Sequence, residues 1–381
     1  MSKLIYLDNA ATTKTAPEVV DAMLPYFSEY YGNPSSIYDF AQKSKEAVTK
    51  GRQQIADALN TRKEDIYFTA GGSEADNQAI LSAAAIGKRQ GKMHIISTAF
   101  EHHAVLHTLK KLEKEGFEIT LLDVGEKGIV SPVQIAEAIR PDTILVTVMY
   151  ANNEIGTIQP IGEIGAVCRQ NGVLFHTDAV QAAGHLPINV KEDQIDMLSL
   201  SAHKFNGPKG IGVLYAKTGV FLTNLIEGGG QERGKRAGTE NLPAIVGMAA
   251  ALEEACALQK ERSIYVTKLR DQLIAGLKKI SGALLNGDET RRLPGNVNFC
   301  FPDTEAEGLL LLLDNKGICA SSGSACTSGF LDPSHVLLAI GRDPQTARGS
   351  LRLTLDYENT PEEVETIIEA VTDTVRILRG C

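Results

Sequence analysis

The chain lacks the features that mark membrane and secreted proteins. No apolar run reaches the ~18 residues that a membrane span needs, and the leucine run from Leu309 to Leu313 ends at Asp314. The opening MSKLIYLDNAATT has neither the apolar segment of a secretory signal nor an Arg- and Ser-rich transit segment. We therefore expect a cytoplasmic protein with no membrane partner.

Basic charge and paired cysteines are also scarce. The 38 Lys and Arg residues against 47 Asp and Glu leave a formal net charge of −9 (38 − 47), and a surface of that sign repels phosphate backbones. The six cysteines contain no C-x-x-C pair, so they indicate neither a disulfide framework nor a structural zinc site. We expect no direct nucleic-acid partner and no metal.

Several catalytic fingerprints are missing. Neither G-x-G-x-x-G nor G-x-x-x-x-G-K-[ST] occurs, which weakens a dehydrogenase or P-loop NTPase interpretation. H-E-x-x-H and G-x-S-x-G are absent too, so zincin and hydrolase interpretations lack support.

What the chain does contain is a repeated alternation of strand-like and helical segments. Hydrophobic residues at 43% and charged residues at 22% indicate a globular protein, and 381 residues suggest two or three structural units at about 150 residues each. Between about residues 66 and 217, β-rich runs alternate with helical patterns, which predicts an α/β domain with a mostly parallel sheet. The runs are IYFTA, MHIISTA, EITLLDV, TILVTVMY, LFHTDAV, MLSLSAH and IGVLYAK.

The pattern changes after the Gly-rich segment EGGGQERGKRAGTEN. A long helix through LPAIVGMAAALEEACALQKE is expected to link two domains, and fewer strands follow it (NVNFCF, ICASS and SLRLTL). Thr360, Pro361 and Glu363 form a capping box that predicts a final helix with one apolar stripe. We expect residues 15–255 to form a large domain, and residues 1–14 with 256–381 to form a smaller α+β domain.

Polar residues gather directly after the predicted strands. In an open α/β sheet, ligands bind outside the carboxyl ends of the strands. Five such positions stand out: the GGSE segment at Gly71–Glu74, His102–His103, Asn152–Asn153, Asp178, and His203–Lys204.

The AGGSEADN segment places glycines between a strand and a helix. Backbone N–H groups near Gly72 and the Ser73 hydroxyl would meet a phosphate at that helix N-terminus. The simpler alternative is that Ser73 is an ordinary N-cap on a tight turn.

Asp178 and Lys204 lie at the ends of apolar strands, where burial of a charged group is costly unless the group is paired or has a function. A buried carboxylate such as Asp178, two residues after His176, needs a cationic partner or hydrogen bonds, and the alternatives are a structural ion pair or a helix N-cap. A lysine in a partly desolvated pocket becomes a usable amine nucleophile. Lys209 is the rival amine, but its Gly/Pro turn favours solvent.

The combination of these groups matches what pyridoxal phosphate requires. A lysine holds the aldehyde as a Schiff base, and a carboxylate keeps the pyridine nitrogen protonated so that the ring accepts electrons. The loop at Gly72 and Ser73 would bind the phosphate, His102 would lie over the ring, and Gln181 would bond the ring hydroxyl. His103 is the less favoured stacking residue, although sequence does not separate two adjacent histidines.

A second chemical centre lies near the C-terminal end. Cys326 belongs to a run of small polar residues, CASSGSACTSGFLDPSH, that predicts a mobile loop over about residues 320–333. A thiol there could move between a pocket and a partner, although an incidental surface thiol has the same pattern. The cysteines at 168, 256, 300 and 319 have the pattern of ordinary buried thiols. Arg352 leaves the apolar face of its strand, either to clamp a substrate carboxylate or as a solvated edge charge.

The chain resembles the pyridoxal-phosphate-dependent cysteine desulfurases of the class with a long active-site loop. The resemblance runs nearly end to end and rests on eight motifs in order: YLDNAATT, GNPSS, EHHAVL, NNEIGTIQP, HTDAVQ, SAHKFNGPKGIG, RAGTEN and SSGSACTSG. It implies a fold-type I enzyme, with a seven-stranded sheet in its large domain. The phosphate loop departs from the commoner pattern at Ala70 and Ser73, and Ser73 keeps the hydroxyl.

The resemblance also implies a role for each matching residue. Lys204 would hold the cofactor, Asp178 would face the pyridinium nitrogen, Gln181 the ring oxygen, and His102 would stack on the ring and assist proton transfer. Ser73, Ser201 and His203 would bind the phosphate. Asn153 and Arg352 would hold the substrate carboxylate. Thr239 would reach the phosphate of a neighbouring subunit, which implies a homodimer, and Cys326 would accept the sulfur.

The implied reaction is conversion of L-cysteine to L-alanine, with the sulfur left on the enzyme as a persulfide. An acceptor protein, either an iron–sulfur scaffold or a tRNA-thiolation enzyme, would then receive it. The chain ends at Cys381, without the longer tail that some relatives use to dock a scaffold, so both acceptors stay open. The alternatives are an aminotransferase, a lyase acting on selenocysteine or cystine, and a non-catalytic platform for sulfur-handling partners.

Overall fold

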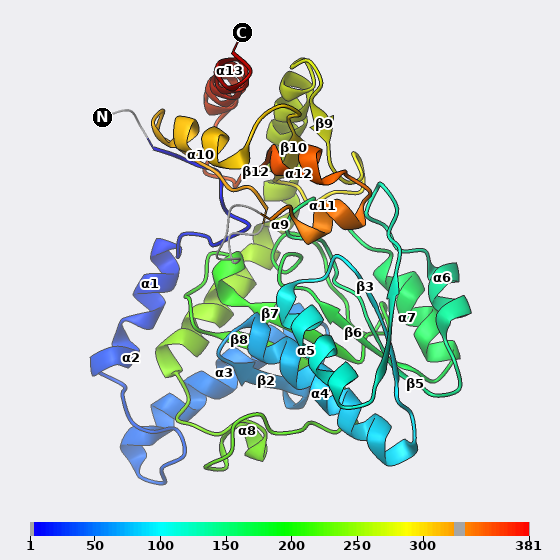
Figure 1. The fold of residues 1–381 in the computed structure, drawn as a ribbon. Coiled ribbons are helices and arrows are strands. Elements are labelled where there is room, and N and C mark those ends of the chain that lie inside the picture. The colour runs from blue at the N-terminus through cyan, green and yellow to red at the C-terminus, as the bar shows by residue number, and fades with distance from the viewer. Residues whose placement is uncertain (1–3, 324–331, 381) are drawn as a thin grey trace.

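A seven-stranded sheet forms the centre of the larger part of the protein in the computed structural model, which describes residues 4–323 and 332–380 (Figure 1). The strand order is β2-β8-β7-β6-β5-β3-β4, and only β8 runs antiparallel to its neighbours. The expected mostly parallel α/β sheet is therefore confirmed, and each strand coincides with one of the seven β-rich runs. The strands are β2 (Ile66–Thr69), β3 (His94–Thr98), β4 (Glu118–Leu122), β5 (Thr143–Thr147), β6 (Leu174–Asp178), β7 (Met197–Ser201) and β8 (Gly212–Ala216).

Helices cover both faces of this sheet, which explains why its strands are almost wholly apolar. Neighbouring residues of a strand point to opposite faces, and Ile95 and Ile96 of β3 belong to two different hydrophobic cores. One core includes residues of α4 (Gly72–Gln90) and α5 (His103–Lys114). The other includes residues of α1 (Pro17–Met23), α3 (Gln42–Ala58), α6 (Pro132–Ala138), α7 (Ile161–Gln170) and α9 (Leu242–Leu277).

A smaller group of strands and helices packs around a third core. The sheet order is β12-β10-β9, and β1 pairs with β11 beside it. These elements are β1 (Ile5–Tyr6), β9 (Leu284–Leu285), β10 (Asn296–Cys300), β11 (Ile318–Cys319), β12 (Ser350–Thr354), α10 (Ala306–Asp314), α11 (His335–Ala339), α12 (Pro344–Arg348) and α13 (Pro361–Leu378). The short helices α2 (Pro25–Ser28) and α8 (Gln231–Gly234) lie at the far end of the molecule from α13 (Figure 1).

The helix α13 begins where the capping box predicts. The Thr360 hydroxyl accepts from the Glu363 N–H, and the Glu363 carboxylate accepts from the Thr360 N–H, both at 3.3 Å. Its apolar stripe, including Val364, Ile367 and Val371, is buried in the third core. The local sequence alone therefore determines both the start of α13 and the face it buries.

The 36-residue helix α9 joins the two parts, as expected (Figure 1). Its first half packs against α1 and α3, and its second half contributes Val266, Leu273 and Leu277 to the third core. Within residues 4–323 and 332–380, it is the one helix long and apolar enough to span a membrane, and half of its most apolar stretch is buried inside the protein. Burial between two cores accounts for that composition. The domain division near residue 255 stays a prediction, since α9 runs unbroken past that point.

Candidate active site

One cavity of about 270 Å³ lies at the carboxyl ends of the central strands. It collects side chains that are far apart in the sequence, because parallel strands all end at the same edge of the sheet. Ten of the predicted site residues line it: Gly72, Ser73, His102, Asn153, Asp178, Gln181, Ser201, His203, Lys204 and Arg352.

Lys204 enters this cavity from a single 3₁₀ turn, Ala202–Lys204, directly after β7. Its Nζ donates to the backbone carbonyls of Ala10 (2.5 Å) and Ala11 (2.7 Å), so the N-terminal segment holds the amine in place. The rival, Lys209, is exposed, and its Nζ lies 3.4 Å from the Thr13 carbonyl. Of the two lysines, only Lys204 lines the cavity that contains Asp178.

Asp178 is the last residue of β6, and it is buried. Burial raises the pKa of its carboxyl to about 6, while the Val180 N–H (2.9 Å) and the charge of Lys204 act in the opposite direction. Asp178 is therefore mostly ionised at neutral pH and supplies a negative charge at the floor of the cavity. No ring or cation of this chain is hydrogen-bonded to it among the described residues.

Behind Asp178 lies a buried polar layer. His176 contacts the hydroxyls of Thr147 (Nδ1, 2.8 Å) and Ser199 (Nε2, 3.0 Å), and burial lowers its pKa to about 3. Its Nε2 is also 3.7 Å from the carboxylate of Asp76, a buried cavity residue whose pKa burial raises. His176 is thus neutral at neutral pH, so a structural ion pair between His176 and Asp178 does not explain the aspartate.

Glu101 is the third buried carboxyl of this region. It accepts from the Thr98 hydroxyl (2.6 Å) and from the Met149 N–H (3.0 and 3.1 Å). Burial nevertheless raises its pKa to about 8, and the charge of Asp178 acts in the same direction.

The raised pKa of Glu101 predicts a pH dependence of stability. The folded state binds this proton up to about pH 8 and the unfolded state only up to its ordinary value of about 4.5, so stability is lost as pH rises between these values. In Glu101→Gln, the free energy of unfolding should fall less between pH 5.5 and 8 than in the native protein, measured by urea unfolding with the cofactor bound. The exposed Glu137→Gln is the control. An equal fall in native protein and Glu101→Gln contradicts this assignment.

His102 and Gln181 line the cavity together with Lys204 and Asp178. The His102 Nδ1 accepts from the Ala104 N–H (3.1 Å) and caps α5. Burial and the charge of Lys204 lower the pKa of His102 to about 4, so the ring is neutral at neutral pH. The Gln181 Nε2 donates to the Ala10 carbonyl (3.0 Å).

His103 also lines the cavity, but its ring packs on two other imidazoles. The ring centroids of His107 and His335 lie 5.0 and 4.6 Å away, and the His103 Nε2 is buried without a hydrogen-bond partner. The preference for His102 over His103 as the stacking residue stays a prediction, since both rings reach the cavity.

The end of the cavity beside α4 is suited to an anion. The N-cap of α4 is Gly71, which has no side chain to bind the first N–H groups of this 19-residue helix. A Cβ at Gly72 would lie 2.7 Å from Val180 Cγ2, so a larger residue does not fit there. Ser73 follows as a residue of the helix itself, and the alternative that it is an N-cap is therefore wrong. Ser201 and His203 line the same end.

Arg352 of β12 is buried, so the alternative of a solvated edge charge is wrong. Although β12 is an edge strand, Arg352 turns inward. Its Nη2 lies 2.8 Å from Asp8 Oδ1, and its Nη1 donates to the carbonyls of Asn153 (3.2 Å) and Gly323 (3.0 Å). Its Nε has no hydrogen-bond partner in the part of the chain that the structure describes. Arg352 and Asn153 both line the cavity and are joined by the hydrogen bond from Nη1.

One predicted residue does not line this cavity, and another lies outside the described residues. Thr239 is exposed and does not line it. Cys326 lies outside the described residues, as does Cys381. Among the other cysteines, Cys168 and Cys300 are buried as expected, Cys319 is half-buried, and the prediction for Cys256 is wrong, because it occupies an exposed position on α9.

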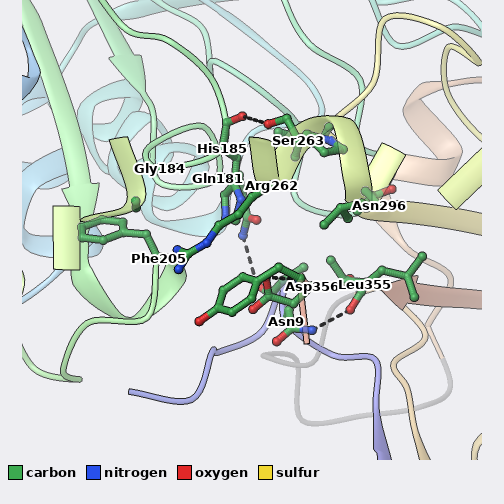
Figure 2. Close-up of a pocket in the computed structure, with 18 of the residues that line it drawn as sticks. Asn9, Gln181, Gly184, His185, Phe205, Arg262, Ser263, Asn296, Leu355 and Asp356 are labelled. Atoms are coloured by element: carbon green, nitrogen blue, oxygen red, sulfur yellow. Dashed lines mark hydrogen bonds between the residues drawn. The ribbon is translucent and has the colours of Figure 1, made fainter. Parts of the chain in front are cut away.

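A second, smaller cavity of about 50 Å³ shares Ala10 and Gln181 with the first (Figure 2). It lies between the two parts of the protein, where the Asn9 amide donates to the Thr354 carbonyl (2.8 Å) and the Ser263 hydroxyl donates to the His185 carbonyl (3.1 Å). Neither Lys204 nor Asp178 lines it. The candidate chemistry therefore belongs to the first cavity.

Sequence reasoning assigned no role to several residues of the site. The Ala10 and Ala11 carbonyls bind Lys204, and Glu154 and His335 line the cavity. All four lie within or beside quoted motifs (YLDNAATT, NNEIGTIQP and the segment ending DPSH). The contacts of the Ala10 and Ala11 backbone carbonyls cannot be predicted from residue type. Glu154, an acidic residue directly after Asn153, could have been noticed in the sequence.

The residues present fit pyridoxal phosphate. A lysine amine and a buried, ionised carboxylate line one cavity, a neutral imidazole lies beside them, and a helix N-terminus without a side-chain cap lies at one end. These groups match the aldehyde, ring nitrogen, ring face and phosphate of that cofactor.

Comparisons with known proteins agree with this geometry. Residues 5–367 match the family model Aminotransferase class-V. The chain is 55% identical to a cysteine desulfurase IscS of Clostridium botulinum over 97% of this chain and 94% of that protein, and 54% identical to one of Methanosarcina thermophila over 100% and 94%. Among solved structures, a NifS-like protein has a TM-score of 0.92 at 35% identity, covering 98% of this chain and 100% of that one. A structure titled SspA in complex with cysteine has a TM-score of 0.83 at 37% identity, covering 93% and 100%.

Proposed function

Because the chain belongs to the class-V aminotransferase family as a pyridoxal-phosphate-dependent cysteine desulfurase, we propose that it releases L-alanine from L-cysteine and passes the sulfur through Cys326 to an acceptor protein. The observation that carries this proposal is the single cavity lined by Lys204, Asp178, His102 and Arg352. Amine, carboxylate, imidazole and guanidinium stand there in the arrangement that amino-acid chemistry on this cofactor needs.

We assign the cofactor contacts by position in the cavity. Lys204 binds the aldehyde, Asp178 faces the ring nitrogen, Gln181 faces the ring oxygen and His102 covers the ring. The phosphate contacts come from the α4 end: Gly72, Ser73, Ser201 and His203. When bound, pyridoxal phosphate acts as an electron sink that makes the Cα proton of the amino acid acidic.

The chain's own groups then handle the substrate and its protons. Arg352 and Asn153 hold the substrate carboxylate at the end of the cavity away from α4. The Lys204 amine takes the Cα proton. The neutral ring of His102, whose Nδ1 accepts from the Ala104 N–H, carries its own proton on Nε2 and is able to donate a hydrogen bond there.

The sulfur step uses a protein thiolate. The Cys326 sulfur forms a bond to the substrate sulfur while the substrate C–S bond breaks, and the electron pair of that bond stays on carbon. Protonation of that carbon and of Cα then gives L-alanine. The balance is L-cysteine plus a protein thiol giving L-alanine plus a protein persulfide, with no external oxidant or reductant.

A homodimer is the second part of the proposal. Large apolar side chains between residues 20 and 40 are exposed, a surface that monomers rarely leave open: Val20, Leu24, Phe27, Tyr31, Ile37, Tyr38 and Phe40. Thr239 is exposed as well and lies outside its own chain's cavity. Both observations support a second copy whose phosphate Thr239 reaches.

We propose an iron–sulfur scaffold or a tRNA-thiolation enzyme as the acceptor, and the cytoplasm as the location. The described cysteines at 168, 256, 300 and 319 are all free thiols, which fits a reducing compartment. Cell fractionation tests the location.

One experiment tests activity, acceptor and assembly together. Holoenzyme collected by gel filtration should have twice the chain mass of 41.0 kDa, and with ³⁵S-labelled L-cysteine it should release alanine and bind label in equal amounts. Added scaffold with iron, or thiolation enzyme with tRNA, should remove the label from the enzyme. A monomer peak contradicts the dimer, label retained with both acceptors contradicts the transfer step, and absence of alanine contradicts the activity.

A further inference from the structure

We propose that Glu154 is a positioning residue for sulfur transfer, because its carboxylate is hydrogen-bonded to Ser334 and packs directly against Gly323, residues on the two sides of residues 324–331. The inference rests on the proposed function, in which Cys326 accepts the sulfur. Glu154 follows Asn153 in the loop after β5, lines the cavity and is 1% exposed.

The backbone of Glu154 is fixed from both parts of the protein. Its N–H donates to Asn152 Oδ1 (2.9 Å), within the loop that follows β5. Its carbonyl accepts from the side-chain amides of Asn296 and Asn298 in β10, both at 3.1 Å. The backbone that carries the Glu154 carboxylate is therefore held by hydrogen bonds from both parts of the protein.

On one side, the carboxylate lies against the residue that leads into 324–331. A Cβ at Gly323 would be 2.6 Å from Glu154 Oε2, and Gly323 has φ +119°, so glycine is required there on both counts. The Gly323 carbonyl accepts from Arg352 Nη1 (3.0 Å), which also binds the Asn153 carbonyl. Ser322, one residue earlier, accepts at its carbonyl from the Ser350 hydroxyl (2.7 Å).

On the other side, the same carboxylate accepts a hydrogen bond from the hydroxyl of Ser334. Ser334 also accepts from the Val336 and Leu337 N–H groups (3.1 and 3.3 Å), so it caps α11. The next residue, His335, lines the cavity. Glu154 thus joins the entry at Gly323, the exit at Ser334 and the substrate residue Asn153.

This arrangement separates two functions of the site. Lys204 is bound by the Ala10 and Ala11 carbonyls and Asp178 by the Val180 N–H, whereas the Glu154 carboxylate is bound by Ser334. A change at Glu154 should therefore leave the Cα chemistry intact and slow only the step that needs the chain beyond Gly323 at the right distance from Asn153 and Arg352.

Variants can break this contact from either partner. Glu154→Asp keeps the charge but withdraws the carboxylate by one methylene, away from Gly323 and Ser334. Gly323→Ala forces a Cβ against Glu154 Oε2. The double variant Glu154→Asp/Gly323→Ala places the shorter carboxylate opposite the added methyl group. Its rate of sulfur gain should therefore be higher than that of Gly323→Ala alone. The exposed Glu137→Asp is the control.

The test uses holoenzyme and two readouts. The first is exchange of the L-alanine Cα hydrogen with ²H₂O by NMR, which needs no thiol. The second is the rate at which the Cys326 peptide gains one sulfur from L-cysteine in a single turnover, by mass spectrometry. For Glu154→Asp and Gly323→Ala, we expect exchange within about twofold of native and sulfur gain at least about tenfold slower.

The outcomes distinguish this inference from the proposed function. If both rates fall together, or if sulfur gain is unchanged, Glu154 does not position the sulfur step. If native protein releases alanine from L-cysteine without sulfur on Cys326, the proposed function fails and this inference fails with it.

Discussion

Replacing Lys204 by Ala should lower alanine release from L-cysteine by at least about a thousandfold, because in the proposed function the amine both binds the cofactor and moves the Cα proton. Exchange of the Cα hydrogen with ²H₂O should be lost in parallel, measured by NMR on the protein saturated with pyridoxal phosphate. The fold should survive, since the Ala10 carbonyl keeps its hydrogen bond from Gln181. A small primary amine added to the solution should restore part of the exchange.

Lys209→Ala is the matched control for this result. Lys209 is five residues away, in a Gly/Pro turn and not in the 3₁₀ turn of Lys204. It is exposed and lines the adjoining pocket with Ser73 and His203, not the cavity that contains Asp178. We expect exchange and alanine release in Lys209→Ala to stay within a few-fold of the native rates. Loss in Lys209→Ala with activity retained in Lys204→Ala would reverse the assignment of the two amines.

Replacing Cys326 by Ala should abolish sulfur transfer and leave the cofactor chemistry in place. Persulfide formation should fall at least about a hundredfold because no other thiol takes the role of nucleophile. Visible absorbance of the bound cofactor and exchange of the L-alanine Cα hydrogen should match the native protein. The combination separates a desulfurase from an aminotransferase, which has no use for this thiol.

Cys256→Ala provides the control, since Cys256 is an exposed thiol on α9. Sulfur gain and alanine release should be unchanged in this variant. Full desulfuration by Cys326→Ala would refute the role of Cys326, and sulfur found on Cys256 in that variant would identify the true acceptor.

Sequence patterns were sufficient for the large sheet and the last helix. Strands covered on both faces are mostly apolar, as in the fully buried β5 and β7, and helix caps depend on residues three apart, as at Thr360 and Glu363. The run ICASS contains β11, but the two-residue strands β1 and β9 were not predicted. The pairing of Ile5 in β1 with Ile318 in β11 joins distant segments through backbone groups that carry no local signal.

The site residues also divide into those that local sequence patterns predicted and those that they did not. Groups that follow strands were found by residue type, because a charged residue at the end of an apolar run is visible in the sequence; Asp178 and Lys204 are the examples. The burial of Arg352 could not be predicted in this way, because a side chain on an edge strand can point either to solvent or into the protein. Its burial depends on Asp8 and Gly323, which are distant in the chain.

The contacts of Lys204 and Glu154 show why the rest required the structure. Lys204 is held by two backbone carbonyls, which any residue type could supply. Glu154 is held by Asn296, Asn298 and Ser334, whose side chains reach it from β10 and from the start of α11. Which side chains from different elements meet at Glu154 depends on how those elements pack. The periodicity within one element does not predict this.

Peptide mapping after borohydride reduction tests the central claim most directly. The reduction fixes the cofactor covalently to the amine that binds it, and mass spectrometry of the digested protein then locates the added mass. The account predicts one pyridoxyl phosphate group per chain, on Lys204. Attachment to Lys209 or to any other lysine, or a protein that carries no added mass after loading, would contradict it.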